Sequence, residues 1–215
     1  MTKKKVVEPV KLLNQQQWKM AASGAGAIVC QPRKKGLRVL LSERAANVGQ
    51  GRGITGGGFV ECGDVLTKKV GTVIQTADEA FRECCQENGG FEKVISKDAF
   101  LERAQSVSSI HARTDDLNEV HAATMYALVV NKREWKQFAA LPPGVDEHGK
   151  IEREGPLLEY FVRWYGTIDR REPERYVSIS DPSGRVLYTT DVFHPHEFHA
   201  IAMIAWHLQN GKLWR

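Results

Sequence analysis

The strongest constraint in this sequence is the octet at residues 82–89, Arg-Glu-Cys-Cys-Gln-Glu-Asn-Gly, together with what precedes it. Residues 76–79, Thr-Ala-Asp-Glu, have the form of a capping box, so a helix is predicted to begin there. Residues three and four positions apart on a helix are surface neighbours. The octet therefore presents two carboxylates and one amide on a single helix face, from Glu83, Gln86 and Glu87.

A glycine-rich stretch with acids lies upstream of this helix, at residues 56–64, Gly-Gly-Gly-Phe-Val-Glu-Cys-Gly-Asp. Carboxylate and amide oxygens are the ligands that Mg²⁺ prefers. The helix face and the acidic loop together predict an all-oxygen cation site. The alternative is that these acids form only a solvated helix face.

The order and spacing of these residues resemble the Nudix hydrolase family, whose box reads Gly, five residues, Glu, seven residues, then Arg-Glu-(apolar)-x-Glu-Glu-x-Gly. Gly58 and Asp64 match the opening glycine and acid. The second half of the box is matched by Arg82, Glu83, Cys84, Gln86, Glu87 and Gly89. The resemblance implies a mixed β-sheet sandwiched between helices. It also implies Mg²⁺ or Mn²⁺ as cofactor, and hydrolysis of the diphosphate bond in a nucleoside diphosphate linked to another moiety.

Three departures from the box stand out. Asp64 and Gln86 each replace a glutamate, and seventeen residues rather than seven separate Asp64 from Arg82. The extra residues, about 65–75, are expected to form an insertion, which costs little because loop closure entropy grows only logarithmically with length. They are too apolar for a free loop, so we expect them to pack on the domain or on a partner subunit as a short hairpin. The alternative function is a catalytically impaired Nudix-like domain that binds nucleotides or regulates.

The resemblance implies a role for each box residue. Glu83 and Glu87 are expected to bind the metal, assisted by Gln86 and Asp64. Arg82 is expected to orient neighbouring carboxylates through bidentate bonds, with direct phosphate contact as the alternative. The expected catalytic residues are thus Glu87, Glu83 and Arg82.

The substrate and the general base involve residues outside the octet. Gly57 and Gly58 let the backbone approach a ligand closely, and either Phe59 or Tyr126 is a candidate to stack on a nucleobase, with packing in the core as the alternative for both. Within the box, Glu87 is a candidate general base. The candidates on loops are Glu147, Glu152 and Glu154.

Composition is that of an ordinary globular protein: 215 residues, 42% hydrophobic and 26% charged. We expect a single domain with an N-terminal extension over about residues 1–22. No apolar run approaches the ~18 residues needed to span a membrane, so no membrane partner is expected. Four cysteines without zinc-type spacing favour reduced thiols and a cytoplasmic location.

The net charge of +4 favours anionic ligands, in keeping with a nucleotide-type small molecule as the partner. No stacking motif supports RNA binding, so no nucleic-acid partner is expected. The oligomeric state is open between a monomer and a homodimer.

Two other partial motif matches do not predict a site. Residues 51–56 satisfy GxGxxG, but a β-like Phe-Val-Glu follows where the dinucleotide motif needs a helix. Residues 196–199, His-Glu-Phe-His, are one position short of the HExxH zinc motif.

Hydrophobic periodicity predicts an α/β (α+β) order of elements. The expected helices cover residues 8–21, 77–88, 98–104, 157–164 and 195–209. The expected strands cover 25–30, 37–41, 106–113 and 120–130, with a hairpin over 176–190.

Overall fold

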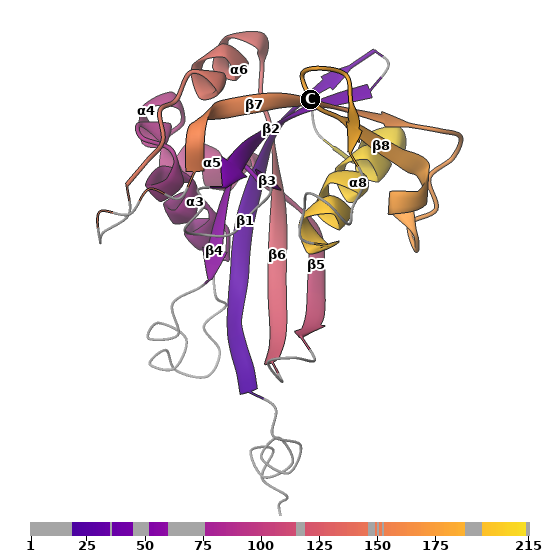
Figure 1. Cartoon of the computed structure of the whole chain (residues 1–215), viewed down its shortest axis with the longest axis horizontal. Coiled ribbons are helices and arrows are strands. Elements are labelled where there is room, and N and C mark those ends of the chain that lie inside the picture. Colours follow the sequence, from indigo (N-terminus) through magenta and orange to yellow (C-terminus); the bar gives the residue numbers. More distant parts are fainter. Residues whose placement is uncertain are drawn as a thin grey trace, which may run out of the picture.

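The computed structural model describes residues 19–34, 36–44, 52–59, 76–114, 119–145, 149, 151, 153–187 and 195–213. The strands of these residues form one nine-stranded mixed sheet with helices on both faces (Figure 1). The strands are β1 (Lys19–Arg33), β2 (Gly36–Arg44), β3 (Arg52–Gly53), β4 (Gly56–Phe59), β5 (Gln105–Thr114), β6 (Glu119–Val129), β7 (Arg153–Trp164), β8 (Val177–Ser180) and β9 (Val186–Leu187). The helices are α3 (Thr76–Glu87), α4 (Phe91–Val94), α5 (Lys97–Arg103), α6 (Lys132–Ala139) and α8 (Pro195–Gln209), with a 3₁₀ turn at Pro173–Tyr176.

The sheet is built around β1. Its order is β5-β6-β1-β2-β7-β8-β9, with β3 paired to β2 and β4 paired to β1. The pairing of β1 with β6 is parallel, whereas β2 and β4 run antiparallel to β1. Strand β4 pairs with residues 24–27 of β1, so it brings the glycine-rich stretch to the centre of the sheet.

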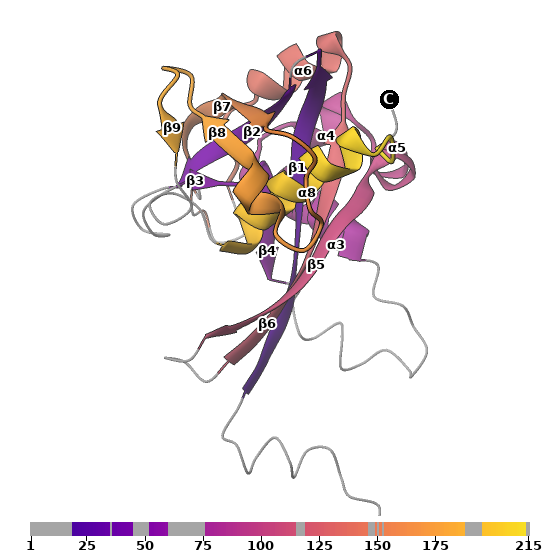
Figure 2. The same cartoon turned by 90° about the vertical axis from the view of Figure 1, so that its right-hand side faces the viewer.

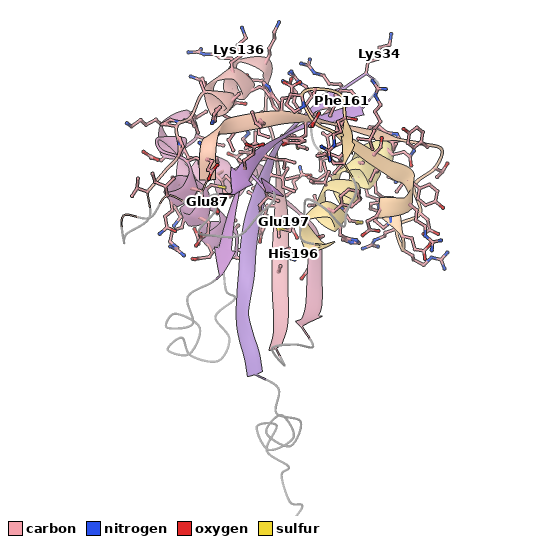
Figure 3. All side chains as sticks on the ribbon, in the orientation of Figure 1. Lys34, Glu87, Lys136, Phe161, His196 and Glu197 are labelled. Carbon is pink, nitrogen blue, oxygen red and sulfur yellow. The ribbon has the colours of Figure 1, made fainter. Side chains whose placement is uncertain are left out.

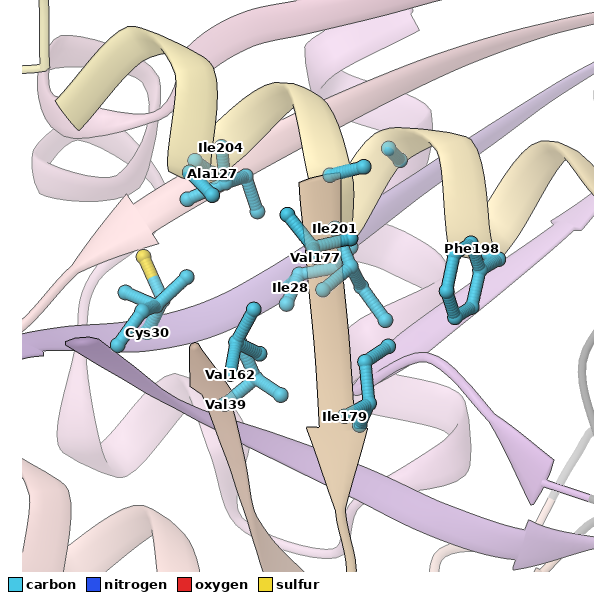
Figure 4. Close-up of a cluster of buried hydrophobic side chains, with 14 of the residues drawn as sticks. Ile28, Cys30, Val39, Ala127, Val162, Val177, Ile179, Phe198, Ile201 and Ile204 are labelled. Atoms are coloured by element: carbon cyan, nitrogen blue, oxygen red, sulfur yellow. The ribbon is translucent and has the colours of Figure 1, made fainter. Parts of the chain in front are cut away.

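Alternate side chains of β1 enter two different cores, because successive residues of a strand point to opposite faces. Ile28 and Cys30 pack with Ile201 of α8 (Figure 4). Ala27 and Val29 pack in a second cluster with residues of α3, α4, α5 and α6. Figure 2 shows α8 on one side of the sheet and α3 on the other. The expected mixed sheet between helices is thus confirmed.

Most of the expected elements are present, and two are wrong. Residues 157–164 form part of β7 rather than a helix, because β7 pairs along its length with β2. The expected helix over 8–21 is wrong at residues 19–21, which belong to β1, and its remainder lies outside the described residues. The sequence reading also missed α4 and α6.

In the part of the chain that the structure describes, no helix combines the length and the apolar character needed to cross a membrane. Cys30, Cys84 and Cys85 are free thiols, and Cys62 lies outside the described residues.

Candidate functional site

One carboxylate of α3, that of Glu87, meets the glycine-rich strand β4. The Glu87 Oε1 atom accepts the backbone N–H of Gly57 at 3.0 Å. Glu83 lies one turn earlier on the same helix. Glu83 is only 7% exposed and Glu87 only 9% exposed. Two acids of one helix are therefore buried side by side, and one of them is oriented by the glycine-rich backbone. Figure 3 shows Glu87 beside β4 and β7.

Gly56 allows this close approach. A Cβ atom at residue 56 would lie 2.7 Å from the Cα atom of Cys84, which no real contact permits. The Cys84 thiol, in turn, donates to the Gly56 carbonyl at 3.8 Å. Helix α3 can therefore rest directly on β4 only because residue 56 has no side chain.

The first turn of α3 differs from the predicted capping box. Thr76 is itself helical, and its hydroxyl pairs with the Tyr126 hydroxyl of β6 at 2.5 Å. Glu79 binds the guanidinium of Arg82 rather than a first-turn amide. The capping box is therefore wrong in its geometry, although the helix starts where it was expected. Both polar groups found partners from the tertiary structure and from the next helical turn.

Arg82 bridges two carboxylates. Its guanidinium binds Glu79 through Nε, at 2.9 Å, and through Nη2. The same Nη2 atom binds Glu83. Arg82 therefore contacts two neighbouring carboxylates, which is the contact that its expected orienting role requires.

Arg153 of β7 anchors the C-terminal end of α3. Its side chain is buried, and its Nε donates to the Glu87 carbonyl at 3.1 Å while Nη2 donates to the Leu141 carbonyl at 2.8 Å. Its Nη1 donates to the carbonyl of Gly155. The Glu87 carbonyl also accepts the Gly144 N–H at 2.7 Å, so the helix end, the loop and β7 are fixed together.

A second buried network supports the same corner. The Asn88 side chain donates to the carbonyls of Thr55, at 2.8 Å, and of Cys84, at 2.9 Å. The Thr55 hydroxyl accepts the Val29 N–H at 2.8 Å and donates to the Leu40 carbonyl at 2.6 Å. This side-chain network ties β1, β2 and the start of β4 to the end of α3. The sequence reading missed Arg153, Thr55 and Asn88.

Burial and charge perturb the titration of neighbouring groups. Burial raises the pKa of the Cys84 thiol well above its usual range, and the negative charges of Glu87 and Glu83 raise it further. Burial also lowers the pKa of Arg153 to about 10, partly offset by the charge of Glu87. Cys84 is therefore a buried packing residue, and Arg153 provides positive charge near Glu87.

Gln86 and Glu154, two other residues predicted for the site, lie away from the contact between Glu87 and Gly57. Gln86 is half-buried and lines a hollow of about 560 Å³ together with Arg82, Cys85 and Val145, on the outer side of α3. Glu154 is exposed on β7, opposite Glu43 of β2. Strand alternation directs it away from the side that the neighbouring Arg153 occupies.

Several expectations concern residues that the structure does not describe. Gly58 and Phe59 are described only as backbone of β4, next to Gly57. The insertion at 65–75 and three of the predicted acids lie outside the described residues: Asp64, Glu147 and Glu152.

The described donors suit a hard divalent cation. Glu83 and Glu87 offer carboxylate oxygens from one helix face, whereas Gln86 lines the hollow beside Arg82. Within the described residues, no three His, Cys, Asp or Glu side chains gather into a complete metal site. The oxygen-only donor set fits Mg²⁺ or Mn²⁺ better than zinc.

Among solved structures, the chain is similar to a MutT/nudix family protein from Enterococcus faecalis, with 14% identity and a TM-score of 0.51, over 95% of this chain and 71% of that one. A NUDIX hydrolase from Alicyclobacillus acidocaldarius matches with 13% identity and a TM-score of 0.42, over 65% of this chain and 78% of that one. An Ap4A hydrolase from C. elegans matches with 9% identity and a TM-score of 0.43, over 88% of this chain and 98% of that one. No family model matches the sequence, and neither does any curated protein. The chain thus has a Nudix-like fold, as the resemblance of its box implied.

Proposed function

We propose that this protein is a metal-dependent Nudix-type hydrolase that cleaves the diphosphate bond of a nucleoside diphosphate linked to another moiety. One observation carries the proposal. Glu83 and Glu87 lie buried one turn apart on α3, and the Gly57 N–H of the glycine-rich strand holds the Glu87 carboxylate. A Nudix-like fold with this pair at the box position supports hydrolysis of a phosphoanhydride.

Each residue of the site has a separable task. Glu83 and Glu87, with Gln86 and Asp64 as further ligands, would hold Mg²⁺ or Mn²⁺, which supplies charge neutralisation of the diphosphate and acidifies a water. Arg82 keeps Glu83 oriented, and the Gly57 N–H does the same for Glu87. Their burial limits competition from bulk water, which strengthens each electrostatic contact.

The proton acceptor is proposed among carboxylates that can reach the attacking water. Glu87 is the candidate within the box, and Glu147 and Glu152 are the candidates on the loop before β7. Glu154 is the weaker candidate, because strand alternation directs it away from the Arg153 side of β7, where Glu87 lies.

Turnover assays test the proposal. Wild type, Glu83→Gln and Glu87→Gln would be compared on a panel of nucleoside diphosphates linked to a sugar, a second nucleoside or phosphate, with Mg²⁺ or Mn²⁺. We expect turnover by wild type and a loss of about 100-fold or more in each variant, because each removes a charged metal ligand. Calorimetry with Mn²⁺ should show weaker binding to Glu87→Gln.

Glu92→Gln is the matched control. Glu92 is an exposed acid of α4, and the change removes the same charge outside the site. The proposal fails if wild type turns over none of these substrates, or if Glu92→Gln loses as much rate as Glu87→Gln.

A second function, a nucleotide-binding domain without turnover, is favoured by one observation. Gln86 contributes no charge, and it lines the outer hollow beside Arg82 rather than the side where Glu87 meets Gly57. That function gives saturable binding of Mn²⁺ and nucleotide but no hydrolysis with any metal in the panel.

A further inference from the structure

Five cations from two distant parts of the sequence gather at one end of the molecule. Arg33 and Lys34 stand at the turn between β1 and β2, and Lys132, Arg133 and Lys136 stand on α6. All five are exposed. We call these five residues the basic patch. Figure 3 shows Lys34 and Lys136 at the same end of the molecule, away from Glu87.

A groove joins the two halves of the basic patch. A hollow of about 430 Å³ is lined by Arg33 from the turn and by Lys132 and Lys136 from α6. Its floor is rigid, because the Arg38 guanidinium lies 4.5 Å above the Trp135 ring and binds Glu159 at 2.7 Å. Three of the five cations therefore line one preformed groove, and Lys34 and Arg133 are their neighbours in sequence.

The basic patch has little compensating negative charge. Among the described residues, none of its five members forms an ion pair. The hollow beside Lys34 is lined by two acids, Glu102 and Glu134, and Glu134 is already held by Arg103 at 2.7 Å. The positive field of the patch therefore reaches solvent largely unopposed.

Local stability does not explain the position of these charges. Lys132 and Arg133 occupy the first turn of α6, where the helix dipole is positive and cations are unfavourable. The mutual repulsion of five exposed cations is a further cost. Both costs are relieved when a polyanion lies along the groove.

We propose that the basic patch is a docking surface for the phosphate backbone of a nucleic acid. The sequence alone predicts no nucleic-acid partner because it lacks a stacking motif; the docking inferred here depends on charge and does not require stacking. It is independent of the hydrolase proposal, since none of the five residues belongs to the α3 site.

A nucleic acid fits the patch better than a membrane or an acidic protein. Peripheral membrane binding combines basic charge with inserted apolar side chains. The exposed large hydrophobic residues of the described chain all lie outside the patch: Val145, Ile151, Tyr165 and Val186. A protein partner would need a large apolar interface core. The apolar lining of the groove is small, because it consists of the buried Trp135 ring and two alanines, Ala139 and Ala140. Regularly spaced phosphates need only cations along a groove.

Fluorescence anisotropy with a labelled, unstructured RNA tests the proposal. An RNA of about 20 nucleotides is long enough, because this length exceeds common single-strand binding sites. EDTA in the buffer keeps the α3 site metal-free. We expect wild type to bind, and its affinity to fall steeply between about 50 and 200 mM salt. Lys132→Glu/Lys136→Glu should weaken RNA binding by about tenfold or more. It should also lower the slope of log affinity against log salt concentration by about 1.4, the value expected for the loss of two phosphate contacts on a single strand.

Arg171→Glu/Arg185→Glu is the matched control, because it makes the same net charge change on exposed residues outside the patch. Its binding should stay within about twofold of wild type. Glu87→Gln should bind RNA as wild type does, which separates this result from the fate of the hydrolase proposal. Circular dichroism checks that each variant is folded.

Three results would overturn the docking surface. The first is no RNA binding by wild type at low salt. The second is equal weakening in the two double variants, which reports net charge alone. The third is retention on phosphatidylserine vesicles without RNA binding, which assigns the patch to a membrane.

Discussion

At the C-terminal end of α3, one buried guanidinium holds three backbone carbonyls, those of Glu87, Leu141 and Gly155. Arg153→Met would remove the guanidinium donor from all three carbonyls while keeping a long apolar side chain. The Glu87 carbonyl would still accept the Gly144 N–H. Each buried group left unsatisfied costs about 1 kcal/mol or more, so we expect a loss of about 2–4 kcal/mol in the free energy of unfolding. Urea denaturation measures this loss.

Arg163→Met is the control on the same strand. Arg163 is exposed and stacks on Phe161 at 5.2 Å, so its loss should cost about 1 kcal/mol or less. Similar losses in the two variants would mean that the three carbonyls contribute nothing specific at residue 153.

Gln86 is the box residue whose side chain carries no charge. Gln86→Glu adds a carboxylate beside Glu83 on α3, so we expect a lower Mg²⁺ concentration for half-maximal rate, by Coulomb attraction. Titration of the hydrolysis rate with Mg²⁺ measures the change. Unchanged metal dependence would show that residue 86 does not reach the metal.

The contact between α3 and β4 is the element on which the site depends. Gly56→Ala places a Cβ atom 2.7 Å from the Cys84 Cα, so the helix must move away from the strand. We expect a loss of about 1–3 kcal/mol in stability and weaker Mn²⁺ binding, because Glu87 loses the Gly57 N–H. Thermal unfolding and Mn²⁺ calorimetry report the two effects separately.

Gly89→Ala is the matched substitution in the same box. A Cβ atom there has its nearest neighbours at 3.4 Å, which the surrounding loop can accommodate. Its stability should stay within about 1 kcal/mol of wild type. If Gly89→Ala were as damaging as Gly56→Ala, the steric account of the α3–β4 contact would be wrong.

The elements that the sequence predicted correctly are those with local signals. The helix over 195–209 and the hairpin over 176–190 are examples, although α8 is buried at every position from 200 to 205 rather than on a single face. Residues 157–164 have apolar side chains on both faces, with Leu157 in one core and Tyr160 in the other, so their periodicity does not distinguish a strand from a helix. These residues form a strand because they pair with β2, and the sequence of residues 157–164 alone does not show that pairing. For α6 the signal was present but unused, since Asn131 and Glu134 form a capping box.

The candidate site shows the same division. The box places Glu83 and Glu87 on one helix face because they are close in sequence. Arg153 reaches the Glu87 carbonyl across 66 positions, and no motif marks it. The sequence could not have revealed it, because a buried arginine is recognised only by the carbonyls around it.

At the scale of the whole molecule, stability should depend on pH through His207 of α8. Burial is the main cause that lowers the pKa of His207 from its ordinary value of 6.5. The unfolded chain therefore takes up this proton before the folded protein as pH falls. The free energy of unfolding therefore includes the full contribution of neutral His207 above pH 6.5, and this contribution is lost as the pH falls below that value.

Urea denaturation at about pH 7.5 and about pH 5.5 checks this sign. Wild type should lose more stability on acidification than His207→Gln, which has no proton to take up at this position. Equal losses in the two proteins would assign the pH dependence to other groups.

The position of β1 at the middle of the sheet has a consequence for how the chain folds during synthesis. Its parallel partner β6 comes about one hundred residues later, with Cys30 beside Val129. A nascent chain can form the β1–β2 hairpin early, but the other edge of β1 stays open until β6 has left the ribosome. An open strand edge recruits other chains, so the yield of native protein should depend on translation speed and chaperone supply more than its final stability would indicate.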